Sequence, residues 1–257
     1  MFRDWQCLGY GFGVYSRGAR FCGAGDVELG LRRRPRPPRR HGDATGGARP
    51  CRAIVEATSL PVSADLEKGF SDAPDGVAET IRLAAATGLV GCTIEDFSGD
   101  PQKPLFDFNH AKVRIEAAVG AARRLPFPFT LTARAEGFLR GNPDLDDTIK
   151  RLQAFEAAGA DVLMAPGLPD LATVRTVCAA LSRPFSFMAG IKGRSFSTAE
   201  LAHAGVKRIS LATSLYRAAM SGLVNAAREV KEQGTFGYVE ATMATPEFDS
   251  FMRGPLP

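Results

Sequence analysis

Few of the 257 residues are of the kinds that build disulfide frameworks or zinc sites. The chain has three histidines, and its cysteines are widely separated and never form a Cys-x-x-Cys pair. The cysteines are Cys7, Cys22, Cys51, Cys92 and Cys178. This spacing argues against a zinc-ribbon pattern and against a secreted, disulfide-stapled protein. A reducing, cytoplasmic location is therefore expected.

Long apolar stretches are also missing. No run approaches the ~18 apolar residues of a membrane-spanning helix, and Met1–Arg20 lacks the basic and then apolar pattern of a secretory signal. The composition is otherwise that of a globular protein, with 45% hydrophobic and 23% charged residues. We expect no membrane association, and a chain long enough for one large domain of ~250 residues or two small ones.

The positive charge is concentrated in one short segment. The net charge is +4, and Arg32–Arg40 reads RRRPRPPRR without a single acid. Such a composition is typical of a solvated, disordered arm. A nucleic-acid-binding arm is disfavoured because no aromatic residues interleave with the arginines to stack on bases.

The chain divides into three parts of different character. Residues 1–51 are rich in Gly, Arg and Pro and lack sustained apolar periodicity, residues 52–235 alternate between short apolar runs and amphipathic stretches, and residues 236–257 form a tail. The expected strands are Val62–Asp65, Gly91–Glu95, Phe129–Arg134, Asp161–Ala165, Phe185–Ala189 and Lys207–Ala212. The expected helices are Arg52–Thr58, Gly76–Thr87, His110–Leu125, Asp144–Ala158, Leu168–Leu181, Thr198–Ala204 and Leu215–Gln233.

Regular alternation of strand and helix predicts a parallel sheet with right-handed crossovers. Eight such units close a (β/α)8 TIM-type barrel, and six are visible here. The sequence therefore predicts an α/β barrel that is incomplete, with its first two βα units missing or disrupted.

Polar residues gather where three successive strands end. The first strand is followed by Asp65 and Glu67, the second ends in Glu95, and the third is followed by Arg134 and Glu136. In a barrel this edge carries the active site. Carboxylates meeting an arginine there suit Mg²⁺, with the arginine as a fork for a substrate carboxylate or phosphonate. The alternative is a set of ordinary loop ion pairs.

Five motifs stand out along the strand–helix part of the chain: ADLEKGF, TIED, LTAR, FEAAGADVLMAPG and GVKRISLATSLYRAAMSGL. Together they resemble the isocitrate lyase/phosphoenolpyruvate mutase superfamily, and the resemblance runs from about Arg52 to Val239. It implies a barrel enzyme that uses Mg²⁺ and acts on a small 2-oxo acid or phosphonate through an enolate-like intermediate. It also implies that Asp65, Glu67 and Glu95 hold the metal and that Arg134 binds substrate, with Glu136 beside it as a catalytic candidate.

One departure from the superfamily pattern reduces the range of reactions that we expect. Its lyases carry a K-x-C-G-H loop with a general-acid cysteine, whereas the corresponding loop here reads FSGDPQKPLFD. The loop therefore argues against C–C lysis and leaves C–P mutation or decarboxylation of an oxaloacetate-type acid. Lys103 is the candidate substrate-binding residue of the loop. The alternatives are a ketopantoate-forming barrel, an inactive barrel remnant, or a binding protein that uses its basic arm.

The first part of the chain carries a different signal. With GC-rich codons, Gly23–Arg32 read one nucleotide later spells ALATSSSGF, which looks like the second strand of the superfamily. We therefore hypothesise that residues 17–51 are an out-of-frame product.

The last expected helix, Leu215–Gln233, has an apolar face. This face either closes the barrel or, as the resemblance implies, packs on another subunit, giving a homodimer or homotetramer.

Overall fold

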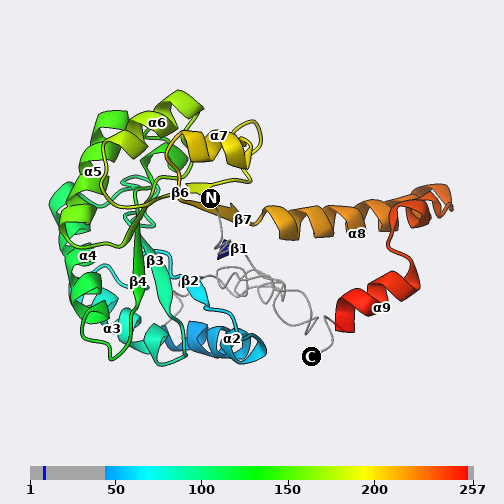
Figure 1. Cartoon of the computed structure of the whole chain (residues 1–257), viewed down its shortest axis with the longest axis horizontal. Coiled ribbons are helices and arrows are strands. Elements are labelled where there is room, and N and C mark those ends of the chain that lie inside the picture. The colour runs from blue at the N-terminus through cyan, green and yellow to red at the C-terminus, as the bar shows by residue number, and fades with distance from the viewer. Residues whose placement is uncertain (1–7, 10–43, 254–257) are drawn as a thin grey trace.

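The computed structural model describes residues 8–9 and 44–253, which form one curled sheet of parallel strands with its helices (Figure 1). The strand order is β1-β7-β6-β5-β4-β3-β2. The strands are β1 (Leu8–Gly9), β2 (Ser63–Asp65), β3 (Gly91–Glu95), β4 (Thr130–Arg134), β5 (Val162–Met164), β6 (Phe185–Met188) and β7 (Arg208–Ala212). All six predicted strands are present, and the predicted incomplete barrel is confirmed.

Helices connect the strands in the predicted alternation. They are α2 (Ala44–Ala57), α3 (Pro74–Ala85), α4 (Phe108–Ala122), α5 (Leu145–Ala157), α6 (Leu171–Ala179), α7 (Thr198–His203), α8 (Ser214–Gln233) and α9 (Thr245–Arg253), with short 3₁₀ helices η1 (Gly137–Leu139) and η2 (Gly237–Ala241). The six helices expected after the first strand end within three residues of their predicted bounds. The helix expected from Arg52 begins earlier, at Ala44, and contains Pro50.

The structure adds one strand near the N-terminus that the sequence does not predict, and it does not describe most of residues 1–43. Strand β1, which the sequence does not predict, pairs in parallel with β7. The basic segment Arg32–Arg40 lies outside the described residues, as does most of the segment 17–51 that we hypothesise to be out of frame. The division of the chain at residue 51 remains a prediction.

Side-chain caps explain where four of the helices begin. Asp107, Asp144 and Asp170 each accept a hydrogen bond from the backbone N–H three residues further on, at α4, α5 and α6 respectively. Ser197 caps α7 in the same way and forms a reciprocal capping box with Glu200. These bonds satisfy amide donors that the first turn of a helix leaves without partners.

The two faces of the sheet have opposite chemistry. On one face, apolar strand residues such as Ile94, Leu131 and Phe187 pack in the core with helix residues such as Ile81 and Leu152. Because side chains alternate along a strand, the neighbouring positions point to the other, inner face. There the strands carry mostly polar residues, which include Thr93, Glu95, Thr132, Arg134, Ser186 and Arg208.

The C-terminal helices project from the sheet. Figure 1 shows α8 running away from the end of β7, and neither α8 nor α9 has a buried residue. Large apolar side chains are exposed there, among them Leu223 at 61%. The described part of α8 therefore does not close the barrel of its own chain. Among the described residues, no helix combines the length and apolar character needed to span a membrane.

Candidate functional site

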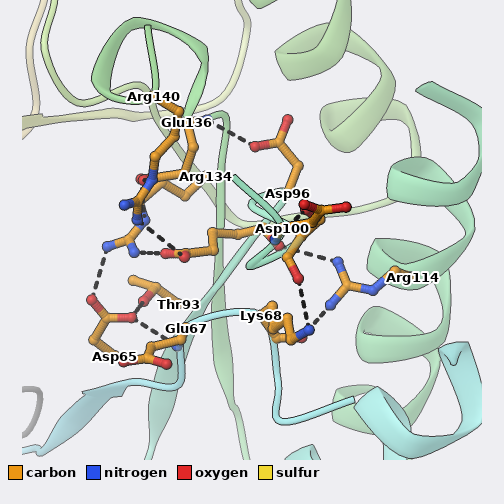
Figure 2. A network of polar contacts seen from close by, with 12 residues as sticks. Asp65, Glu67, Lys68, Thr93, Asp96, Asp100, Arg114, Arg134, Glu136 and Arg140 are labelled. Atoms are coloured by element: carbon orange, nitrogen blue, oxygen red, sulfur yellow. Dashed lines mark hydrogen bonds and ion pairs between the residues drawn. The ribbon is translucent and has the colours of Figure 1, made fainter. Parts of the chain in front are cut away.

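The carboxyl ends of β2, β3 and β4 bring the predicted site residues to one rim of the sheet. Asp65 pairs in register with Thr93, and Glu95 pairs with Arg134. Parallel pairing without a shift explains why acids that end successive strands meet here. The structure therefore brings Asp65, Glu95, Arg134 and Glu136 together. Figure 2 shows Arg134 between Asp65 and Glu136.

Arg134 lies at the centre of this arrangement. Its Nη1 donates to Asp65 Oδ2 at 2.8 Å, its Nη2 pairs with Glu95, and its Nε lies 2.9 Å from Glu136 Oε1. The contact between Arg134 Nε and Glu136 Oε1 is an ion pair whose geometry does not make a hydrogen bond. Both Glu95 and Glu136 are buried. Carboxylates on three sides thus hold the guanidinium in one orientation.

A second arginine, which the sequence did not indicate, joins the same carboxylates. Arg140 Nε donates to Glu136 Oε2 at 2.8 Å, and its Nη2 lies 3.6 Å from Glu95 Oε1. Its guanidinium also stacks on the ring of Phe97, 3.7 Å from the centroid. Glu136 therefore bridges two arginines, and its burial makes it dependent on both.

The turn after β2 is shaped around Asp65. Its Oδ1 accepts hydrogen bonds from the Thr93 hydroxyl and from the Glu67 backbone N–H, both at 2.9 Å. Glu67 has a left-handed backbone with φ of 51°, and its side chain is exposed next to Asp65 (Figure 2). We define the rim cluster as Asp65, Glu67, Glu95, Arg134, Glu136 and Arg140. With all six groups ionised, it carries a net charge of −2.

Asp96 follows Glu95 but points away from the rim cluster. Its Oδ1 accepts from the Glu136 backbone N–H at 2.8 Å, and its Oδ2 pairs with Arg151 Nη1 at 3.2 Å. Burial raises the pKa of Asp96 to about 6, although both of these bonds oppose the shift. Asp96 therefore ties the end of β3 to the segment after β4 and to α5, and its contacts are structural.

Arg114 on α4 is a residue that the sequence analysis missed. It is fully buried and donates to three backbone carbonyls, those of Glu95, Lys68 and Ser71. Its guanidinium lies 4.2 Å from the centroid of the Phe106 ring. An arginine between Ala111, Ile115 and Ala118 on the apolar face of a helix is a signal that could have identified it.

Lys103 occupies a different place from the other predicted site residues. It is exposed in the loop between β3 and α4, where its carbonyl accepts a hydrogen bond from the Ser98 hydroxyl at 2.6 Å. An antiparallel bridge between Phe97 and Leu105 closes the base of this loop. The structure does not bring the Lys103 side chain into the rim cluster, and its role in substrate binding stays a prediction.

The rim cluster fits a magnesium ion in chemistry and charge. Its ligand atoms are hard carboxylate oxygens, which Mg²⁺ prefers, and its net charge of −2 matches a divalent cation. Among the described residues, no group of three or more His, Cys, Asp or Glu side chains is arranged to hold a metal ion. Asp65 and Glu95 both pair with Arg134 instead, so a magnesium ion at this rim would have to keep several of its waters.

The comparisons with known proteins agree with this fold. In a structure of a Burkholderia cenocepacia J2315 protein described as a lyase/mutase, 42% of residues are identical. The match covers 91% of this chain and 83% of that one, with a TM-score of 0.84. The 2-methylisocitrate lyase of Escherichia coli (strain K12) is 29% identical over 202 residues, 76% of this chain and 67% of that protein.

A second curated relative matches over a shorter stretch. The oxaloacetate decarboxylase of Bradyrhizobium diazoefficiens is 31% identical over 138 residues, which are 52% of this chain and 46% of that protein. The phosphoenolpyruvate phosphomutase family model matches residues 43–231, which include every residue of the rim cluster. The chain therefore belongs to the phosphoenolpyruvate phosphomutase family, within the isocitrate lyase/phosphoenolpyruvate mutase superfamily.

Proposed function

We propose that this protein is a Mg²⁺-dependent enzyme of the lyase or mutase type that acts on a small 2-oxo acid or phosphonate. The observation that carries the proposal is the single orientation of Arg134, which carboxylates from β2, β3 and the segment after β4 hold at the rim. Relatives named 2-methylisocitrate lyase and oxaloacetate decarboxylase support the class of substrate.

Arg134 is the proposed binding group for the acid end of the substrate. A guanidinium that is already oriented loses less entropy when it binds a carboxylate or phosphonate, and its planar fork matches either group. Glu136 orients Arg134. Both of its carboxylate oxygens are engaged, one with Arg134 and the other with Arg140. Its contacts support a positioning role within the predicted catalytic pair.

The charge of the rim cluster explains why a metal would be required. An anionic substrate approaching a cluster of net charge −2 is repelled until a cation neutralises the excess. Asp65, Glu67 and Glu95 would hold Mg²⁺, and when bound the ion would stabilise the negative charge of an enolate-like intermediate. We therefore expect substrate affinity, and not only the rate of reaction, to depend on Mg²⁺.

The bond chemistry that we favour is decarboxylation or C–P rearrangement. The loop from Phe97 to Asp107 contains neither Cys nor His to protonate a leaving group in C–C lysis.

Turnover measurements on the full chain test this function. Oxaloacetate and carboxyphosphonoenolpyruvate are supplied with and without Mg²⁺, and wild type is compared with Arg134→Ala and with the exposed control Arg175→Ala. We expect turnover of one substrate that requires Mg²⁺ and falls roughly 100-fold in Arg134→Ala, as expected for loss of a charged hydrogen bond. Absence of turnover with both substrates would favour an inactive barrel remnant.

We also propose that the protein assembles as a homo-oligomer through α8 and α9. These helices expose Leu223, Val230, Phe248 and Phe251 without a buried residue on either helix. Exposed apolar side chains that gather on a projecting element are typical of an interface. A second copy of the chain is the partner that the resemblance to the superfamily implies.

A further inference from the structure

A second arginine on the inner face of the sheet lies outside the rim cluster. Arg208 comes from β7, and its Nη1 donates to the Thr132 hydroxyl of β4 at 3.1 Å. The side chain therefore reaches across the inner face from one strand to another that is three places away in the sheet. Thr132 stands two residues before Arg134 on the same face of β4, so the Cα atoms of these two residues are about 7 Å apart along the strand.

The charge of Arg208 has no acidic counterpart in the part of the chain that the structure describes. Burial alone lowers the pKa of its guanidinium to about 10, with no carboxylate acting in the opposite direction. Arg114 differs, because both of its Nη atoms donate to backbone carbonyls and the carboxylates Asp72 and Asp96 oppose the lowering of its pKa. Arg208 is half-buried, and charges removed from water are normally paired, so a half-buried guanidinium without a carboxylate partner is a candidate for binding an anion.

Unsatisfied hydrogen-bonding atoms lie next to this charge. Arg208 Nε is buried and has no hydrogen-bond partner. Ser186 of β6 pairs in register with Arg208, is 0% exposed, and its hydroxyl also has no partner. Since buried polar atoms are satisfied in most proteins, two unsatisfied donors on adjacent strands point to a missing acceptor.

We propose that Arg208 and Ser186, with Thr132 holding the guanidinium in place, form an anion-binding subsite deeper in the sheet than Arg134. Within the proposed function, on which this assignment of the ligand rests, Arg134 binds one acid group of the substrate and the subsite binds a second one. The enzyme would then select dianionic substrates, such as dicarboxylic 2-oxo acids or phosphono-carboxylates, over monoacids.

Binding measurements with two matched acids test the subsite without depending on turnover. Succinate and butyrate have the same number of carbons and differ by one acid group. Titration calorimetry of the full chain with Mg²⁺ present compares their affinities in wild type, Arg208→Met, Arg208→Lys and Ser186→Ala. Arg175→Met is the control, because Arg175 is exposed on α6, away from the sheet's inner face.

We expect wild type to bind succinate more tightly than butyrate. Arg208→Met should weaken succinate binding by roughly 10- to 100-fold, the range for a lost charged hydrogen bond, and should leave butyrate binding unchanged. Arg208→Lys, which keeps the charge without the fork, should give an intermediate loss, and Ser186→Ala a smaller one. Arg175→Met should bind both acids as wild type does.

The unfolding temperature of the ligand-free protein distinguishes an anion-binding role of Arg208 from a purely structural one. A guanidinium without an acidic partner opposes folding, so Arg208→Met should unfold at the same temperature as wild type or a higher one. A lower unfolding temperature together with unchanged succinate affinity would overturn the subsite. If Arg208→Met does not fold, unchanged succinate affinity in both Arg208→Lys and Ser186→Ala would overturn it equally.

The subsite and the proposed function can fail separately. Loss of succinate binding in Arg208→Met, without turnover of either tested substrate by wild type, would keep the subsite and refute the enzyme proposal. Turnover by wild type, with the succinate affinity and the KM for oxaloacetate both unchanged in Arg208→Met, would do the reverse.

Discussion

Glu136 offers the most direct test of how the rim cluster is held together. The substitution Glu136→Gln keeps the shape of the side chain and removes its charge. Glu136 is 0% exposed and contacts Arg134 Nε at 2.9 Å and Arg140 Nε at 2.8 Å. The glutamine would retain one acceptor oxygen and would turn an N–H₂ group towards one of the two guanidinium groups, where donor faces donor.

The magnitude follows from burial. Removing one partner of a buried ion pair costs about 3–5 kcal/mol, because the remaining charge stays buried without compensation. Arg134 keeps its contacts with Asp65 and Glu95, and Arg140 is partly exposed, so the loss should lie at the low end, about 3 kcal/mol. Urea denaturation at neutral pH, followed by circular dichroism, measures the free energy of unfolding.

A matched control uses the same substitution on the surface. Glu116→Gln breaks an exposed ion pair between Lys112 and Glu116 on α4, with an N···O distance of 3.3 Å. Such pairs contribute about 0.5 kcal/mol or less. If Glu136→Gln and Glu116→Gln lower the free energy of unfolding equally, the charge of Glu136 does not hold the two arginines, and the reasoning about the rim cluster is wrong.

Three further predictions concern other parts of the molecule. Arg114→Met should lower the free energy of unfolding by about 3 kcal/mol in urea denaturation, because three backbone carbonyls lose their donor, and a loss below 1 kcal/mol would contradict this. Leu223→Glu should shift the protein to monomer in light scattering after size exclusion, whereas Arg228→Glu, also on α8, should not; an unchanged oligomer in Leu223→Glu would exclude this face. Asp96 has a folded-state pKa of about 6 against 3.8 as its ordinary value, so its protonated form favours folding. Compared with Asp96→Asn, wild type should lose about 2 kcal/mol of unfolding free energy as pH rises from 4 to 6, and parallel pH profiles would refute the shift.

The strands and the rim could be predicted from sequence because their signals are local. A buried parallel strand is a short apolar run bounded by turns, and each of the six predicted runs became a strand within one residue of its expected ends. Register then followed from the fold class, since parallel strands end at a common edge. Asp65, Glu95 and Arg134 could therefore be brought together before any coordinates were known.

The arginines could not be placed in the same way. Arg114, Arg140 and Arg208 each reach a partner on another element, and Arg208 bonds to Thr132, 76 residues away in the chain. A long side chain can satisfy any acceptor within its reach, so spacing along the sequence does not identify the partner. The contrast between Glu95 and Asp96 was predictable only after β3 was aligned, because adjacent residues of a strand face opposite ways.

The amphipathic pattern of α8 shows a different limit. Its apolar face indicated that the helix buries one side, and the pattern is equally satisfied by the helix's own barrel or by another subunit. In the structure no residue of α8 is buried, so the choice depends on a partner that the pattern does not identify. Hydrophobic periodicity specifies that a face must be covered, and only tertiary geometry specifies what covers it.

The inner face of the sheet connects stability to function. A TIM barrel normally fills its interior with bulky aliphatic side chains, whereas this sheet presents Thr93, Thr132, Ser186 and Arg208 there. These residues add little hydrophobic stabilisation, so the described fold depends mainly on the apolar layer between the sheet and its helices. A face that stabilises the fold so little, yet keeps a half-buried arginine and buried donors without partners, agrees with the proposed anion subsite. Stability that rises when a dianion binds is therefore the thermodynamic signature that this inner face should produce.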